Sequence, residues 1–160
     1  MIIKSYNGAM DLLIEHLGLS YLNEVFSDFG VQLPNEKSYR ISPKEYSFFF
    51  RRLRNTTFLT REFSAKALDI LSKVEFKNGI AGGVPKGITI AHKFGERGIR
   101  NNGEVAGAEL HDCGIIYVPG NPYLVCIMTK GYNIKELEDI ISKVSSVIFK
   151  NFEMLDKHQQ

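Results

Sequence analysis

Hydrophobic residues in the first thirty positions recur with the period of two short helices. Within segments 5–18 and 20–30, apolar side chains fall three or four residues apart, and each segment ends in a glycine, Gly18 or Gly30. The pattern predicts two helices, and Ser20 is the expected N-cap of the second. The apolar stripe of the first helix consists of Met10, Leu13, Ile14 and Leu17.

Two further helices are predicted after a polar loop. Segment 42–55 starts with Ser42 as a possible cap and Pro43 at the first helical position, and Glu45 completes a capping box. Segment 60–74 carries an apolar stripe at helical spacing. Its members are Phe63, Ala67, Ile70, Leu71 and Val74.

The second half of the chain changes period. Segments 87–93, 111–118 and 123–130 are short runs rich in branched and aromatic residues, and the four-residue turn "PGNP" joins the last two. They predict three antiparallel strands. Asn133 then opens a terminal helix, with Glu136 three residues later. The apolar side of this helix consists of Ile134, Leu137, Ile141, Val144 and Ile148.

This order of elements predicts an α+β fold, in which a helical region packs beside a three-stranded antiparallel sheet covered by a C-terminal helix. A length of 160 residues suits a single domain, 1–160. Its helical part spans about 1–78, and its sheet and last helix span about 79–155. An outer strand of the trio lacks a partner and carries little protecting charge, so part of the fold is expected to be missing.

Composition and charge place the chain among ordinary globular domains. Apolar residues make up 44% and charged residues 24%, and the net charge of +2 does not by itself indicate a nucleic-acid partner. The basic cluster Arg51, Arg52 and Arg54 is interpreted as a solvated helix face. No apolar run reaches the length of a membrane span, and the first residues lack the pattern of a signal peptide.

The two cysteines, Cys113 and Cys126, fall in neighbouring predicted strands. If those strands pair around "PGNP", the two side chains share a face without lying directly opposite, which favours buried free thiols over a disulfide. The sequence contains no CxxC, HExxH or comparable spacing, so neither a metal nor another cofactor is expected.

Two short stretches carry candidate chemistry. "SYN" places Ser5 and Asn7 at the start of the first helix, where they can serve as helix caps or point into a cleft. "AHKFGERG" brings Lys93 to the end of a strand just before Gly95. A lysine beside a residue without a side chain can bind an anion that lies against the backbone, and the alternative is a solvated lysine before a turn.

Three other polar residues are interpreted as structural. They are His92, His111 and Asp112, which fall in or beside the predicted strands. Histidines at strand ends and an aspartate bonded to backbone are more common in structural than in acid–base roles.

Taken in order along the chain, these motifs resemble the class A β-lactamase and penicillin-binding serine hydrolase superfamily, of whose domain they cover only the C-terminal part. Ser5 and Asn7 match the Ser-Asp-Asn signature of that family, and Lys93 and Gly95 match its Lys-Thr-Gly signature. The nucleophile motif Ser-x-x-Lys is absent, since no serine here has a lysine three residues on. The resemblance therefore implies a partial β-lactamase-like fold.

The resemblance also implies roles for the matched residues. Ser5 would relay a proton to the leaving nitrogen, and Asn7 would donate its amide to the acyl-amide carbonyl of the substrate. Lys93 would supply positive potential for the substrate carboxylate. Gly95 would leave room for substrate along the strand, and the backbone N–H of Glu96 would form half of the oxyanion hole.

Three departures from the family pattern change this picture. Tyr6 stands in place of the aspartate in the first signature, and Phe94 replaces a hydroxyl residue that helps to bind the substrate carboxylate. Carboxylate recognition therefore stays open. No Glu-x-x-Leu-Asn motif supplies a base for deacylation, and Glu36 is a weak candidate. Slow hydrolysis is expected, which favours a divergent or penicillin-binding member.

The resulting hypothesis is the C-terminal part of a serine hydrolase that transfers the acyl group of a β-lactam or a peptidoglycan-type amide. The isolated chain is expected to be inactive, with a small-molecule substrate and the missing N-terminal segment as partners, and without nucleic acid or metal. Its parent is expected to be exported. One alternative is a non-catalytic binding module that keeps the fold, and another is an unrelated α+β regulatory domain.

Overall fold

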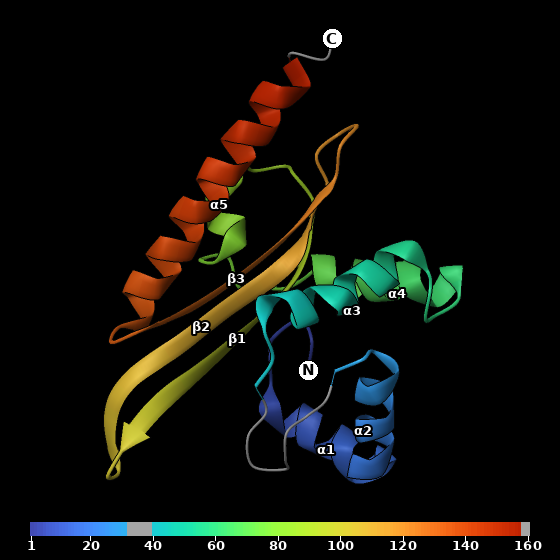
Figure 1. Ribbon diagram of the computed structural model, residues 1–160, viewed down its shortest axis with the longest axis vertical. Helices are drawn as coiled ribbons and strands as arrows, with labels where there is room; N and C mark the ends of the chain where they lie inside the picture. The colour runs from blue at the N-terminus through green and yellow to red at the C-terminus, as the bar shows by residue number, and fades with distance from the viewer. Residues whose placement is uncertain (32–39, 158–160) are drawn as a thin grey trace.

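A computed structural model describes residues 1–31 and 40–157. Helices flank a three-stranded antiparallel sheet in the order β1-β2-β3 (Figure 1). The helical elements are α1 (Asn7–Leu17), α2 (Leu19–Asp28), α3 (Pro43–Asn55), α4 (Arg61–Ser72), the 3-10 helix η1 (Ile80–Gly83) and α5 (Ile134–Lys157). The strands are β1 (Ile90–Asn101), β2 (Glu104–Ile116) and β3 (Tyr123–Gly131). The predicted α+β class is confirmed.

The local signals for helix ends are largely confirmed. The Ser42 Oγ accepts from the N–H of Glu45 at 3.2 Å, and the N–H of Ser42 donates to the Glu45 carboxylate at 2.6 Å, which completes the capping box. Gly18 ends α1 with a φ of 84°. The prediction for Ser20 is wrong, because α2 begins immediately after Gly18 and Ser20 lies inside its first turn.

Strands β1 and β2 form a longer hairpin than the hydrophobic runs predict. They pair from Ile90 opposite Ile116 to Asn101 opposite Glu104. The two residues between them, Asn102 and Gly103, have φ values of 50° and 86°. An Asn-Gly pair with positive φ at both positions matches the twist of a two-residue hairpin turn. The hairpin that this turn closes therefore continues the sheet through the polar segment 94–110.

The register of β2 and β3 corrects the prediction for the cysteines. Cys113 lies directly opposite Cys126, with a Cα–Cα distance of 4.0 Å, and a disulfide joins them. The predicted register was two residues off, because pairing ends at Ile116 opposite Tyr123 instead of continuing to "PGNP". The N–H of Tyr117 donates instead to the carbonyl of Thr89, so this stretch continues beside β1.

Each face of the sheet has its own apolar core. On one face, α5 and η1 cover a cluster that includes Ile80, Leu110, Ile116 and Ile141, all fully buried. On the other face, α3 and α4 contribute Phe50 and Leu71 to a cluster with Ala91, Cys113 and Ile115. Residues alternate between these faces along each strand, so Lys93 and its neighbour Phe94 start out toward opposite sides.

The buried side of α5 differs from the predicted stripe at one turn. Leu137 and Ile141 are buried as expected, whereas Val144 is 41% exposed. Ser145 takes its place in the core, where its hydroxyl donates to the carbonyl of Ile80 at 2.8 Å. This hydrogen bond ties α5 to η1 and satisfies a polar group that burial would otherwise destabilise.

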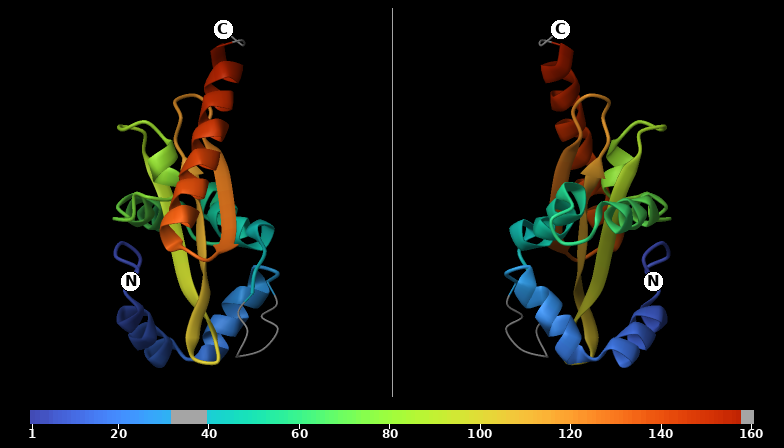
Figure 2. Two further views of the ribbon diagram at one scale, coloured as in Figure 1. Left: turned by 90° about the vertical axis from the view of Figure 1, so that its left-hand side faces the viewer. Right: turned by 90° about the vertical axis from the view of Figure 1, so that its right-hand side faces the viewer.

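Helices α1 and α2 lie at one end of the molecule, away from α5 (Figures 1 and 2). The sheet leaves β1 and β3 as edge strands among residues 1–31 and 40–157. Over the same residues, none of the helices combines the length and hydrophobicity that crossing a bilayer requires.

Candidate active site

The N-terminal segment and β1 meet through a hydrogen bond between two predicted site residues. The Lys93 Nζ donates to the Ser5 Oγ at 2.5 Å, across 88 positions of sequence. A backbone bond from the N–H of Glu75 to the carbonyl of Ile3, at 3.1 Å, holds the segment just ahead of Ser5. Ser5 itself has a φ of 52°, a left-handed conformation that costs a serine about 1 kcal/mol.

The environment of Lys93 favours its neutral form more than water does. The side chain is half-buried, and this burial lowers its pKa below 10.5, while the negative charge of Asp112 acts in the opposite direction. The ammonium also donates to the carbonyl of Phe94 at 2.5 Å and lies 4.5 Å from the centre of the Phe94 ring. The Tyr46 hydroxyl donates to the Lys93 carbonyl at 3.3 Å.

This arrangement can carry a proton. Because the Ser5 Oγ accepts from Lys93, the Ser5 hydrogen is free to donate to another group. A lysine whose pKa is lowered releases its proton more readily than a solvated one, so Lys93 can replace a proton that Ser5 gives away.

Asn7, the third residue of the predicted constellation, lies in the first turn of α1. Its side chain is exposed and has no hydrogen-bond partner among the residues that the structure describes. The carboxamide is therefore open to a ligand, and its proposed contact with substrate stays a prediction.

The predicted substrate-binding residues lie in two different environments. The Phe94 ring stacks on Phe76 at 4.1 Å and packs against the cluster under α5. Gly95 and Glu96 line a cavity of about 450 Å³. A Cβ placed on Gly95 would meet no atom within 4 Å, so open space lies over this glycine. Their roles toward a substrate also stay predictions.

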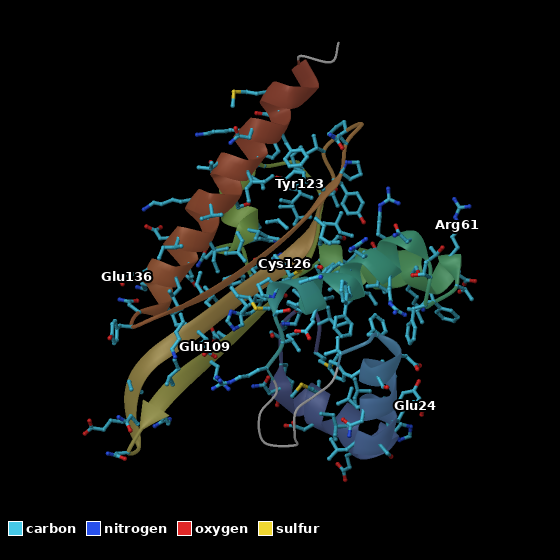
Figure 3. The ribbon with its side chains drawn as sticks, in the orientation of Figure 1. Glu24, Arg61, Glu109, Tyr123, Cys126 and Glu136 are labelled. Carbon is cyan, nitrogen blue, oxygen red and sulfur yellow. A yellow bond between two sulfur atoms is a disulfide. The ribbon has the colours of Figure 1, made fainter. Side chains whose placement is uncertain are left out.

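The cavity extends along the sheet toward the β1–β2 turn. All three strands contribute to its wall, together with Arg40 and Ile41 from the segment that leads into α3. Figure 3 shows Glu109, one of its lining residues, farther toward that turn than Cys126. The Glu109 carboxylate accepts from Arg97 at 2.7 Å.

His92 and Asp112 form a buried pair on the face opposite the cavity. The His92 Nδ1 lies 2.9 Å from one oxygen of Asp112, and the N–H of Ile80 donates to the other oxygen at 2.9 Å. Both side chains are at most 1% exposed. The pair joins β1, β2 and η1, which is the structural role that the sequence predicted for these two residues.

His111 has different surroundings from His92. It lines the cavity, and its Nδ1 is buried without a hydrogen-bond partner within the described ranges. The sequence prediction grouped His111 with the structural residues, and its position one strand away from Gly95 was missed. The Asn-Gly turn at 102–103 indicates that β1 and β2 pair through this segment. The register shifts between Ile99 and Arg100, however, so the turn alone would have placed Leu110 and not His111 opposite Gly95.

Two further sequence hypotheses concern a base and a metal. Glu36 lies outside the described residues. Across the residues that are described, no three His, Cys, Asp or Glu side chains gather closely enough to hold a metal ion.

Comparison with known proteins identifies the family. A profile of the β-lactamase enzyme family matches residues 1–152. The chain therefore belongs to the β-lactamase enzyme family, as its motifs predicted, and the alternative of an unrelated regulatory domain is excluded. No curated protein matches the sequence.

Solved structures of the same fold are similar over nearly the whole chain. PBP-A is 25% identical with a TM-score of 0.78, over 96% of this chain and 59% of that one. A β-lactamase from Sphaerobacter thermophilus is 21% identical with a TM-score of 0.80, over 96% of this chain and 60% of that one. A class A β-lactamase from Bacteroides cellulosilyticus is 18% identical with a TM-score of 0.79, over 94% and 60%. The chain thus spans about three fifths of the length of these proteins.

Proposed function

We propose that this chain forms one wall of the acyl-transfer site of a serine hydrolase, and that the nucleophilic serine comes from a segment outside these 160 residues. The substrate is a β-lactam or a peptidoglycan-type amide. The observation that carries the proposal is the hydrogen bond from Lys93 to Ser5, which joins the two matched signatures in a chain of this family.

The reaction needs a proton for the leaving nitrogen. The nucleophilic serine attacks the carbonyl carbon, and the N–H of Glu96 donates to the oxyanion that develops. When the C–N bond breaks, Ser5 gives its proton to the nitrogen, and Lys93 returns a proton to Ser5. The proton that the attacking serine loses then restores the charge of Lys93, so one proton moves in total from the nucleophile to the leaving nitrogen. Asn7 holds the acyl-amide carbonyl of the substrate.

The second half of the reaction, hydrolysis of the acyl-enzyme, is proposed to be slow. The chain has no Glu-x-x-Leu-Asn motif to activate water. A mutant of PBP-A has been solved as an acyl-enzyme complex with penicillin G. By analogy, this protein would accumulate a covalent adduct, as a penicillin-binding member does, and its parent would act outside the cytoplasm.

Some surfaces of this chain support the proposal of a further segment. The chain covers 59% of PBP-A, both outer strands are unpaired within the described sheet, and α1 and α2 contain no buried residue. A segment that brings the nucleophile would cover these surfaces and gain apolar burial.

The test is reconstitution. The segment encoded directly upstream is expressed with this chain, and turnover of a chromogenic cephalosporin and acylation by penicillin G are followed by absorbance and mass spectrometry. Acylation of a serine in the added segment is expected, and Ser5→Ala should slow it by about 100-fold. Ser146→Ala, on α5 at the opposite end of the molecule from α1 and α2 (Figure 1), is the matched control. Absence of both turnover and an acylated serine contradicts the proposal.

A second candidate is a non-catalytic binding module, which Phe94 and Tyr6 favour because both depart from the family signatures. Such a module would bind penicillin G reversibly. Saturable binding to the reconstituted protein without any mass increase would support it over the hydrolase.

A further inference from the structure

Three arginines lie on the C-terminal half of α3, at the edge of the molecule that the α3–α4 turn forms (Figure 1). Arg51 and Arg54 are exposed, as the sequence predicted, and Arg52 is half-buried. None of the three forms an ion pair with a carboxylate among residues 1–31 and 40–157. Arginine charges that no carboxylate neutralises favour an anionic partner.

Two cavities adjoin these arginines and share Arg51 and Asn55 in their walls. The larger cavity, of about 310 Å³, is also lined by Arg52 and Phe29. The smaller cavity, of about 150 Å³, is also lined by Arg54. Within the described part of the chain, no aspartate or glutamate lines either cavity. A guanidinium group binds phosphate oxygens through paired N–H donors, so both cavities suit a phosphate group.

Aromatic rings form the apolar side of the larger cavity. The guanidinium carbon of Arg52 lies over the Phe29 ring, 4.8 Å from its centre. The Phe58 ring packs on Phe29 with the two ring centres 4.5 Å apart, and 39% of Phe58 stays exposed at the α3–α4 turn. An exposed apolar ring beside cations is typical of proteins that bind at the surface of a bilayer. A soluble phosphate polymer would use the arginines but would offer no hydrocarbon to this ring.

We propose that an arginine patch, consisting of Arg51, Arg52, Arg54 and Phe58, docks this protein onto the surface of an anionic phospholipid bilayer. The guanidinium groups bind headgroup phosphates at the two cavities, and Phe58 enters the boundary between headgroups and acyl chains. None of these residues lines the cavity beside Gly95, so the docking does not depend on the proposed function.

The docking can be followed with a single tryptophan, because the chain contains none. Phe58→Trp places an indole in the patch. Tyr132→Trp is the matched control, since Tyr132 is 90% exposed and follows β3 on the opposite side of the molecule (Figure 1). The full chain is titrated with vesicles of phosphatidylcholine and with vesicles of an equal mixture of phosphatidylcholine and phosphatidylglycerol. Inorganic polyphosphate is the soluble source of the same charge.

The Phe58→Trp indole is expected to shift its emission to shorter wavelength, and to be quenched by brominated acyl chains, with the anionic vesicles only. Tyr132→Trp should show neither change. In the Phe58→Trp background, Arg51→Gln and Arg54→Gln should each weaken vesicle binding about fivefold, the contribution of one cation near an anionic surface. Lys150→Gln, on the exposed side of α5, should leave it unchanged. Sedimentation of the unaltered chain with the same vesicles checks that the indole does not create the binding.

Three results would overturn the proposal. The first is equal binding to neutral and anionic vesicles, or binding to neither. The second is an equal loss of vesicle binding in Arg51→Gln and Lys150→Gln. The third is binding of polyphosphate without any quenching by brominated lipid, which would assign the arginines to a soluble anion instead of a bilayer.

Discussion

The two ends of this molecule differ in how completely they are packed. Around the sheet, α5 and η1 enclose a cluster whose central side chains, such as Leu110 and Ile141, are fully inaccessible to solvent. Helices α1 and α2 contain no buried residue, and Leu12 is 68% exposed. A helix that folds with an apolar stripe needs a surface to cover that stripe. The contrast separates the part of the domain whose apolar surface this chain covers from the part that the further segment of the proposed function would cover.

The largest expected effect is in the well-packed core under α5. Ile141→Ala should lower the free energy of unfolding by about 2–5 kcal/mol, because it removes buried methyl groups and leaves a cavity. Ile140→Ala is a matched control on the same helix, since Ile140 is 47% exposed, and it should change stability by no more than about 0.5 kcal/mol. Urea denaturation of the two variants measures both values. Equal losses would show that α5 is not packed as described.

A smaller effect is expected at the other end. Leu17→Ala should change the stability of the isolated chain by no more than about 0.5 kcal/mol, because Leu17 is already 52% exposed.

Amide protons of α1 and α2 should exchange with solvent faster than those of β2, as local opening of a poorly packed element needs little free energy. Hydrogen exchange followed by mass spectrometry measures this. Protection of α1 equal to that of β2 would remove the contrast between the two ends.

The smallest effect concerns Lys93, which joins the two ends through Ser5. Its pKa is lowered by burial, so at alkaline pH approaching 10.5 the folded chain releases this proton while the unfolded chain still holds it. Release of this proton should therefore add to the free energy of unfolding of the wild type as the pH rises. The Lys93→Met variant should not show this addition. The effect is small because solvent screens a half-buried group.

Denaturation from about pH 8 to about pH 10 compares the Lys93→Met variant with wild type, with Lys44→Met on the exposed start of α3 as the control. Burial raises the pKa of Tyr46, and it raises the pKa of Tyr123 to about 12. These tyrosines oppose the rise at high pH, but they are present in every variant and cancel in the difference. An identical pH slope in wild type and Lys93→Met would show that Lys93 is not desolvated.

Much of the fold follows from local signals in the sequence. The capping box of Ser42 and Glu45, the glycine at the end of α1 and the change of period after residue 78 each act over a few residues. Prediction failed where distant packing decides. Val144 was expected in the core, but the close approach of η1 places Ser145 there, because its hydroxyl can reach the carbonyl of Ile80. A hydrophobicity pattern holds no information about that partner.

The candidate site, like the fold, was predictable where short motifs carry the information and was missed where the pairing of distant segments decides. The approach of Ser5 to Lys93 was expected from motifs, and the structure shows it. The pairing of Cys113 with Cys126 depends on the register of β2 and β3, which a shift of two residues changes without altering the apolar pattern. The place of His111 depends on the register of β1 and β2, which shifts between Ile99 and Arg100. The segment 94–110 was not recognised as strand, because its glycines and charges are poor strand formers.

The left-handed backbone of Ser5 bears on how this chain could evolve. Glycine or asparagine would adopt that conformation at lower cost, so substitutions that relieve this backbone strain would replace the serine. Only a use for the hydroxyl opposes that drift. A descendant relieved of chemistry should therefore lose this serine early, while its sheet and last helix persist.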